Sequence, residues 1–393
     1  MGSLWAQLAP IGRRPASGGY RRFAWTREDA ALREWFAGAC AARGLELTVD
    51  RAGNQWGWWG NPDAGQPGLV LGSHLDSVPE GGAFDGPLGV VSAFAALDDL
   101  CSRGWQPTRP LAVAAFVDEE GARFGVACAG SRLLTGQLDP DRARALTDEQ
   151  GVTMAEAMSA AGHEPEGLGR DERTLARIGT FLELHVEQGR GLVGLNAPVG
   201  VGSGIWPHGR WRLDLAGRAD HAGTTRLQDR DDPMLALAAA VLTARSAAQR
   251  RGAVATIGKL LVQPNGVNAI PSAVTAWLDA RGPDADDVRA VVEEVAAAAA
   301  VPAVEESWTP PTDFPADLSA RLAALVGRPD SPAPVLATGA GHDAGILAAA
   351  GIPSAMLFVR NPTGVSHSPA EHAEPDDCQA GVDALVRVLT ALA

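Results

Sequence analysis

The amino-acid sequence predicts an α/β fold with a mostly parallel sheet, into which a smaller α+β domain is inserted. In the first half, short apolar runs bounded by turn or polar residues alternate with helical patterns, as in sheets whose strands are buried on both faces. The pattern changes after residue 205 and returns near residue 313. We therefore expect one domain at 1–205 and 313–393 and an inserted domain at 206–312.

The elements of the first domain follow in order along the chain. Helical patterns cover Arg27–Arg43 and Leu88–Leu100. Apolar runs predict strands at Leu69–Leu71, Leu111–Val117 and Phe181–Leu184, and the pattern resumes at Pro334–Leu336 and Met356–Val359. In such folds, catalytic groups collect at the carboxyl ends of the strands.

The inserted domain has a different pattern, which suggests two βαβ-like units. Its predicted strands are Trp211–Leu215, Val254–Val262 and Ala273–Leu278, and its predicted helices are Pro233–Gln249 and Asp287–Ala300. The proline-rich stretch Trp308–Pro315 is interpreted as the linker that returns to the first domain.

The composition narrows the class of protein. Of the 393 residues, 46% are hydrophobic and 20% are charged, which is enough apolar material for a sizeable core. The net charge of −14 argues against a nucleic-acid partner. No run approaches the ~18 uncharged apolar residues of a spanning helix, and the N-terminus lacks the pattern of a signal peptide. We expect a cytoplasmic protein with no membrane partner, whose four cysteines show no metal or disulfide spacing.

The segment GSHLDSVPEGGAFDGPLGV, residues 72–90, carries the first candidate site. His74 follows a predicted strand, and Asp85 lies on a glycine-rich loop. An imidazole and a carboxylate at one strand end suit a divalent first-row metal. Asp76 is placed to accept the other ring N–H of His74 and fix its tautomer. The alternative is a glycine-rich surface turn.

Three further segments add acidic and imidazole groups. Glu119 and Glu120 follow a predicted buried strand, where adjacent carboxylates are costly unless cations or hydrogen bonds offset them. The alternative there is an acidic turn in solvent. His185 interrupts a strand pattern and is either a ligand or a hydrogen-bonded structural residue. In SHSPAEH, His367 is the candidate and His372 its rival.

Taken together, these segments resemble the M20-type metal-dependent amidohydrolases of the hydantoinase/carbamoylase branch. That branch contains N-carbamoyl-L-amino-acid hydrolases, allantoate amidohydrolases and β-ureidopropionases. The resemblance runs from GGYRRFAWT to SHSPAEH and rests on the blocks GSHLDS, GGAFDG, DEEGARF, ELHVEQG, DHAGTT, NAIPS and GAGHDA. A histidine followed by VEQG favours this branch over the peptidases.

The resemblance implies a site for two divalent metal ions, which could be Zn, Mn, Co or Ni. Asp85 would bridge them, and the remaining ligands would be His74 and His185 for one metal and Glu120 and His367 for the other. Glu119 would be the general base, which takes a proton from water and delivers it to the leaving nitrogen.

The resemblance also implies substrate contacts. His221 would polarise the oxyanion, and Asn268 and Arg281 would bind the substrate carboxylate. Gln188 and the backbone of Gly341 are further family-type contacts. Relatives often carry proline at the position of Arg226, and the stretch with His208 and Arg210 is more basic than usual. If Arg226 or Arg210 faces the pocket, a second substrate carboxylate is favoured; the alternative is that both face solvent.

The predicted activity is hydrolysis of an N-carbamoyl-L-amino acid to the L-amino acid, carbon dioxide and ammonia. Alternatives are allantoate hydrolysis, deformylation of an N-formyl amino acid such as N-formylglutamate, and an M20 aminoacylase or dipeptidase. A metal-free scaffold would have lost a ligand or the base, and none is missing. The partner is thus a small ureido or N-acyl substrate, and the inserted domain is expected to act as a lid and to form a homodimer.

Overall fold

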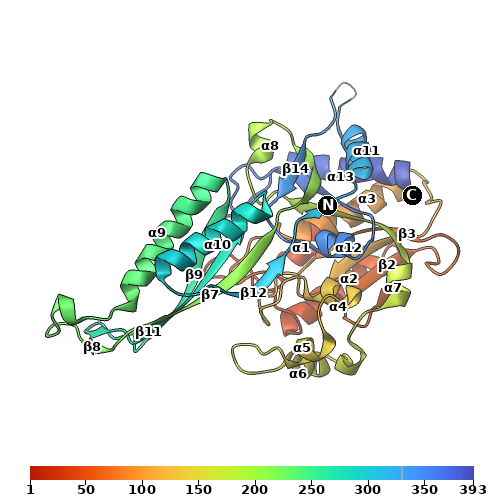
Figure 1. The fold of residues 1–393 in the computed structure, drawn as a ribbon. Helices are drawn as coiled ribbons and strands as arrows, with labels where there is room; N and C mark the ends of the chain where they lie inside the picture. The colour runs from red at the N-terminus through yellow and green to blue at the C-terminus, as the bar shows by residue number, and fades with distance from the viewer. Residues whose placement is uncertain (329–330) are drawn as a thin grey trace. The chain divides into compact units, whose positions relative to one another are not determined.

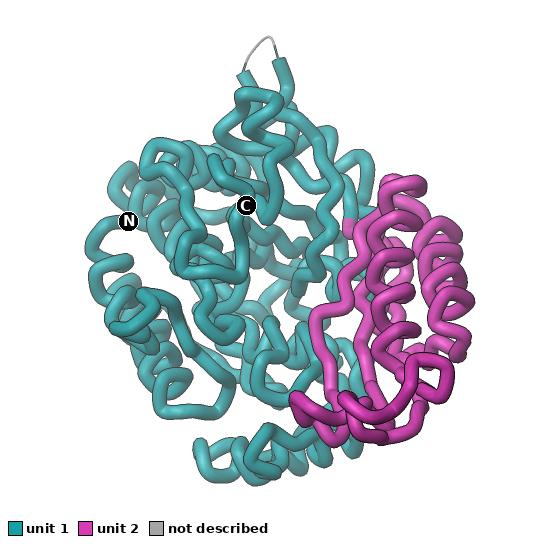
Figure 2. Tube along the Cα trace, turned by 90° about the vertical axis from the view of Figure 1, so that its left-hand side faces the viewer, with its two compact units in different colours: residues 1–204, 313–393 teal, residues 205–312 magenta. Residues whose placement is uncertain are grey.

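The computed structural model describes residues 1–328 and 331–393 as two units (Figure 1, Figure 2). The larger unit comprises Met1–Gly204 and Asp313–Ala393, and the smaller unit comprises Ile205–Thr312. The larger unit has a mixed sheet with a parallel centre, and the smaller has an antiparallel sheet. The predicted fold class is confirmed, whereas the lid and dimer roles of the insert remain predictions.

The larger unit is built around one sheet, which has nine strands among the described residues. Its order is β1-β2-β4-β3-β5-β15-β6-β13, and β14 pairs with β6. The strands are Glu46–Val49 (β1), Gln55–Trp59 (β2), Gly68–His74 (β3), Leu111–Phe116 (β4), Ile178–Val186 (β5), Val199–Ile205 (β6), Thr312–Asp313 (β13), Val335–Thr338 (β14) and Ser354–Val359 (β15).

The centre of this sheet is parallel and buried. β4, β3, β5 and β15 run parallel to their neighbours in this row, whereas β2 and β6 are antiparallel to the outer members. Every residue of β3, β4 and β15 is buried. Because both faces are covered, these strands consist of continuous apolar runs, which made them predictable. The sequence did not predict β1, β2, β6 or β13.

Helices cover the sheet, and two of them also position the site. α3 contacts β3, β4 and β5 and packs on α13, while α12 contacts β5, β15 and α4. The helices of this unit are Gly2–Leu8 (α1), Arg27–Ala41 (α2), Pro87–Ser102 (α3), Ala129–Thr135 (α4), Pro140–Ala145 (α5), Met154–Ala160 (α6), Glu172–Ala176 (α7), Gly191–Gly194 (α8), Ala316–Val326 (α11), Asp343–Ala349 (α12) and Pro375–Leu392 (α13), with a 3-10 turn at Pro165–Gly167 (η1). No helix among the described residues is long and apolar enough to span a bilayer.

The loop before α3 is fixed by its sequence. Pro87 occupies the first turn, where its fixed φ suits a helix and its missing N–H costs nothing. Gly86 precedes it with φ of 79°, a conformation that favours glycine. Asp85 is therefore held directly before the start of the helix, next to the ends of β3 and β5.

The smaller unit is a four-stranded antiparallel sheet with two helices on one face. The sheet order is β12-β7-β11-β9, and one core joins the sheet to both helices. The elements are His208–Ala216 (β7), Asp220–His221 (β8), Leu227–Asp229 (η2), Pro233–Arg251 (α9), Val254–Gln263 (β9), Ala269–Ile270 (β10), Ala273–Arg281 (β11), Ala285–Ala299 (α10) and Val304–Thr309 (β12).

The two expected βαβ units are present but interleaved. β7-α9-β9 and β11-α10-β12 each connect two parallel strands, yet each strand pair is separated by a strand of the other unit, as the antiparallel pairing of β11 with both β7 and β9 shows. The expected linker Trp308–Pro315 is also corrected in part, because Trp308 and Thr309 lie in β12 and Thr312–Asp313 forms β13.

Candidate metal centre

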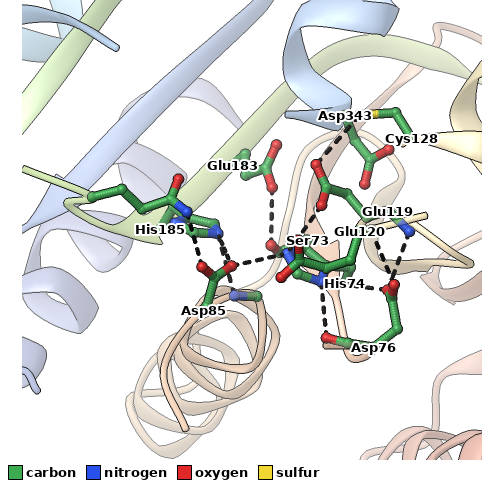
Figure 3. A network of polar contacts seen from close by, with 12 residues as sticks. Ser73, His74, Asp76, Asp85, Glu119, Glu120, Cys128, Glu183, His185 and Asp343 are labelled. Atoms are coloured by element: carbon green, nitrogen blue, oxygen red, sulfur yellow. Dashed lines mark hydrogen bonds and ion pairs between the residues drawn. The ribbon is translucent and has the colours of Figure 1, made fainter. Parts of the chain in front are cut away.

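The candidate site of the larger unit lies where three neighbouring parallel strands end. His74 is the last residue of β3, Glu119 follows β4 by three residues, and His185 is the penultimate residue of β5. Since β4, β3 and β5 are adjacent and parallel, their carboxyl ends bring these side chains to one edge of the sheet (Figure 3).

Asp85 occupies the middle of the site and presents its two oxygens in two directions. Its Oδ1 lies 3.4 Å from His74 Nε2 and 3.2 Å from His185 Nε2. Its Oδ2 lies 3.5 Å from His367 Nε2. The carboxylate therefore stands between two groups of donors.

The second group consists of Asp85, Glu120 and His367. His367 Nε2 lies 3.5 Å from Glu120 Oε2 as well as from Asp85 Oδ2. His372, the rival candidate, instead pairs with Glu374 at 3.3 Å. In this group, and in the group of His74, Asp85 and His185, the ligand atoms all lie within 4.8 Å of one another.

These donors fit divalent cations. Imidazole and carboxylate ligands about 2.0–2.2 Å from a tetrahedral ion lie roughly 3.4 Å from one another, which is close to the separations around Asp85. His74 Nε2 is buried and has no hydrogen-bond partner among the described residues, which leaves its lone pair for a ligand. The predicted ligands are thus brought together, and their metal-binding role remains a prediction.

The electrostatics of the buried acids also favour bound cations at this site. Burial raises the pKa of Glu119 well above its ordinary value, and the charge of Glu120 raises it further. Burial, with the charge of Asp85, raises the pKa of Glu120 to about 8. Burial opposes ionisation of Asp85, but His185 and His74 hold its pKa well below the usual range. Bound cations would offset the repulsion among these acids.

Asp76 positions both sides of the site. Its Oδ1 accepts the backbone N–H of Glu119 at 3.2 Å, and its Oδ2 accepts that of Glu120 at 3.0 Å. His74 Nδ1 lies 3.2 Å from the backbone oxygen and 3.4 Å from Oδ1 of Asp76. The predicted contact with His74 is therefore present, and the aspartate also fixes the turn that carries both glutamates, which the sequence did not indicate.

The other ring nitrogen of His185 is fixed by the backbone. His185 Nδ1 lies 2.8 Å from the carbonyl oxygen of Val186, so this nitrogen carries the hydrogen. Its Nε2 accepts the backbone N–H of Gly86 at 3.2 Å and faces Asp85. The tautomer that binds metal through Nε2 is thus the one that the fold selects.

Gln188 and Gly341 adjoin this group of residues. Gln188 Nε2 donates to Asp85 Oδ2 at 2.9 Å and to Ser366 Oγ at 3.1 Å, while its Oε1 is buried with no partner among the described residues. Gly341 precedes His342, whose ring lies 4.5 Å from that of His185. Glu183, His185 and His342 form a third group of close donor atoms, which shares His185 with the first.

Besides Glu183, two further buried residues of the site were not indicated by the sequence. Cys128 donates from Sγ to Glu119 Oε1 at 3.3 Å. Glu371 accepts the backbone N–H groups of Phe84 and Asp85 through its Oε1. Neither residue carries a local pattern that indicates such contacts, although Glu371 lies in the same SHSPAEH segment as His367.

The predicted residues of the smaller unit fall into two groups, and the first surrounds His221. His221 in β8 pairs in register with Ala269 of β10, and the backbone oxygen of Asn268 accepts the N–H of Ala222. His221 and Asn268 are therefore neighbours and both are exposed. Arg226 lies nearby in the chain, pairs with Asp229 at 2.6 Å and is 71% exposed.

The second group lies at the other end of β7 and β11. Arg281 donates to both oxygens of Asp279, with its Nη2 at 2.7 Å from each. Arg210 Nε lies 3.6 Å from Asp279 Oδ2, and His208 pairs in register with Arg281. Arg281, Arg210 and His208 thus share one face and one end of the sheet.

The two groups are far apart within one chain. The register runs from Ala216 opposite Ala273 to His208 opposite Arg281, which at ~3.3 Å per residue is about 26 Å. β8 and β10 lie beyond the Ala216 end (Figure 1). The structure therefore does not bring His221 and Asn268 to Arg281 within one subunit.

Comparisons with known proteins identify the family. Residues 70–391 match Peptidase family M20/M25/M40. The chain belongs to this family. It is 37% identical to an N-carbamoyl-L-amino acid amidohydrolase of Geobacillus stearothermophilus, over 99% of this chain and 98% of that protein. It is 33% identical to the allantoate amidohydrolase of Escherichia coli K12, over 98% and 96%.

A solved structure agrees with this assignment. A hydantoinase/carbamoylase family amidase from Burkholderia vietnamiensis has a TM-score of 0.87 and 29% identity, covering 99% of this chain and 96% of that one. The predicted M20 family and its hydantoinase/carbamoylase branch are confirmed. M20 enzymes are metal-dependent, which agrees with the groups of donors around Asp85.

Proposed function

We propose that the chain is a two-metal amidohydrolase that converts an N-carbamoyl-L-amino acid and water into the L-amino acid, carbon dioxide and ammonia. One observation carries the proposal: Asp85 turns one oxygen to His74 and His185 and the other to His367, which also faces Glu120. Metal identity follows availability, because such nitrogen and oxygen ligands accept Zn, Mn, Co or Ni.

Glu119 is the general base of the proposed reaction. Bound cations would polarise the attacked carbonyl and acidify a water. The carboxylate of Glu119 then takes the proton from that water and returns it to the leaving nitrogen as the C–N bond breaks. Cys128 holds Glu119 Oε1 while Oε2 faces His74 Nε2 at 3.6 Å, so the base is held at the edge of the donor groups.

Arg281 selects substrates that carry a carboxylate. A guanidinium can bind a planar carboxylate through two parallel hydrogen bonds. Arg281 already makes such a pair with Asp279, from Nε to Oδ1 at 2.8 Å and from Nη2 to Oδ2 at 2.7 Å. The substrate carboxylate therefore competes with, or adds to, Asp279. Because Arg210 also faces Asp279, two guanidinium groups share one acid, and the cluster keeps a net positive charge for an anionic substrate.

The active enzyme is proposed to be a homodimer. His221 and Asn268 lie about 26 Å or more from Arg281 along the sheet, which exceeds the length of a small ureido acid, so these residues serve one substrate only if they come from different subunits. β9 supplies a surface for pairing, because it is an edge strand with exposed Leu260 and Leu261.

A substrate panel tests this function. Purified protein is reconstituted with Zn²⁺, Mn²⁺, Co²⁺ or Ni²⁺ and assayed with N-carbamoyl, N-formyl and N-acetyl amino acids, dipeptides and allantoate. The proposal expects the highest kcat/KM on an N-carbamoyl-L-amino acid. Turnover confined to dipeptides or N-acetyl substrates would refute it.

Allantoate is the second candidate substrate. It is favoured by the identity of 33% to the Escherichia coli allantoate amidohydrolase. The same residues serve it, since allantoate also presents a carboxylate and a linear ureido group. Its kcat/KM relative to that of the N-carbamoyl amino acids separates the two.

A further inference from the structure

Glu371 is a buried acid that none of the roles above explains. It lies four residues after His367 and is only 5% exposed. No arginine, lysine or histidine among the described residues forms an ion pair with it. A buried carboxylate is costly unless hydrogen bonds satisfy it, so the partners of Glu371 indicate its task.

Those partners belong to the loop that carries Asp85. Glu371 Oε1 accepts the backbone N–H of Phe84 at 2.8 Å and that of Asp85 at 2.9 Å. The contact joins residues that are 286 positions apart in the chain. The absence of a side chain at Gly82 provides the space for this contact. A Cβ atom on Gly82 would lie 2.3 Å from Oε1 and 2.5 Å from Cβ of Glu371.

The other oxygen of Glu371 faces the loop that carries His367. Glu371 Oε2 lies 3.4 Å from Ser366 Oγ, and the same hydroxyl lies 3.1 Å from Asp85 Oδ2. A serine hydroxyl has one hydrogen to donate, so Ser366 is shared between the two acids. Glu371 thus touches the backbone of one loop and the side chain next to His367 in the other.

We propose that Glu371 is a positioning residue that sets the separation between Asp85 and His367, and hence the affinity of the second cation group. The proposal rests on the proposed two-metal function. The second group depends most on this contact, because its histidine lies on a loop and is 50% exposed, whereas His74 and His185 are buried in strands. Polar groups behind metal ligands typically change metal affinity by about 10–100-fold.

Three substitutions of Glu371 distinguish positioning from charge. Glu371→Ala leaves the N–H groups of Phe84 and Asp85 without acceptors. Glu371→Asp keeps the charge but shortens the side chain by one methylene, so it no longer reaches both donors. Glu371→Gln loses the charge but keeps an amide oxygen that can accept both N–H groups. Positioning predicts that Gln resembles the wild type and that Ala and Asp do not.

Two further variants complete the set. Gly82→Ala leaves Glu371 in place but pushes its carboxylate aside, because the added Cβ would collide with it. Glu374→Gln is the matched control: this glutamate lies three residues along the same segment, is 55% exposed at the start of α13 and pairs only with His372 among the described residues.

The experiment is a calorimetric titration of each full-length, metal-free protein with Zn²⁺, after circular dichroism has shown that it is folded. We expect the second equivalent to bind at least about tenfold more weakly in Glu371→Ala, Glu371→Asp and Gly82→Ala, and within twofold of wild type in Glu371→Gln and Glu374→Gln. Wild-type affinity for both equivalents in folded Glu371→Ala overturns the proposal. If that variant does not fold, wild-type affinity in Gly82→Ala overturns it.

The titration also separates this proposal from the proposed function. Wild-type protein that binds fewer than two equivalents contradicts the two-metal function and the positioning role together. Two equivalents in the wild type with unchanged binding in the folded variants contradict the role of Glu371 alone.

Discussion

Asp76 offers a quantitative test of how the site is built. Each of its carboxylate oxygens accepts one backbone N–H, from Glu119 and Glu120. Asp76→Asn and Asp76→Ala both remove the charge, but Asn keeps one acceptor and Ala keeps none. A buried N–H without a partner costs about 1–3 kcal/mol. The free energy of unfolding should therefore be about 1–3 kcal/mol lower for Ala than for Asn, near the lower limit if water fills the space.

The Asn and Ala variants are compared with each other because removing the charge of Asp76 has an effect on stability opposite to that of removing its hydrogen bonds. The negative charge of Asp76 contributes to raising the pKa of Glu119 and Glu120, so removing it relieves repulsion in the metal-free protein. This relief is common to Asn and Ala and cancels in their difference. The reduced repulsion does not improve metal binding, because Glu119 and Glu120 lose the hydrogen bonds through which Asp76 positions their backbone.

The assay is urea unfolding followed by tryptophan fluorescence, with and without Zn²⁺. Each tenfold loss of affinity removes about 1.4 kcal/mol of the stabilisation that saturating metal confers. We expect at least that loss in both variants. Asp98→Asn is the control, since Asp98 forms an exposed ion pair with Arg43 on the surface of α3. Equal unfolding free energies for Asn and Ala, together with wild-type metal stabilisation, would refute the positioning of the glutamates by Asp76.

Three further predictions follow from the same structure. Glutamine has nearly the same shape as glutamate, so Glu119→Gln should keep full metal content by mass spectrometry while kcat falls by about 10²–10⁴-fold. A kcat near that of the wild type would show that Glu119 is not the base. Arg281→Ala should raise KM for an N-carbamoyl amino acid by about 10–100-fold, because a hydrogen bond to a charged group contributes about 1.5–3 kcal/mol. The same variant should leave KM for the corresponding amide unchanged. Equal increases for both substrates would reject the carboxylate contact. Leu261 is 56% exposed on edge strand β9, and Leu261→Lys should convert the dimer to a monomer in sedimentation velocity. Val304→Lys, on the opposite edge strand β12, should leave the dimer intact. A dimer that survives Leu261→Lys would show that β9 is not its interface.

The strands and the ligands at their ends could be predicted because their signals are local. β3 and β4 are buried on both faces, so burial alone dictates unbroken apolar runs. Polar residues at or just after the end of such a run, as His74 and Glu119 are, are then conspicuous. The family motifs added Asp85 and His367. His372 stayed a rival, because the sequence of a loop does not indicate which of two histidines five positions apart faces the site.

Only the tertiary structure decided which distant groups meet. It turned His367 toward Asp85 and Glu120 and left His372 with Glu374. It placed Glu371 under the loop of Asp85, and it separated His221 from Arg281 by the length of β7 and β11. The sequence by itself determined the family, the parallel centre of the sheet and the donors at its edge. The remaining contacts join residues far apart in the chain, and such contacts depend on how whole elements pack, which local periodicity does not encode.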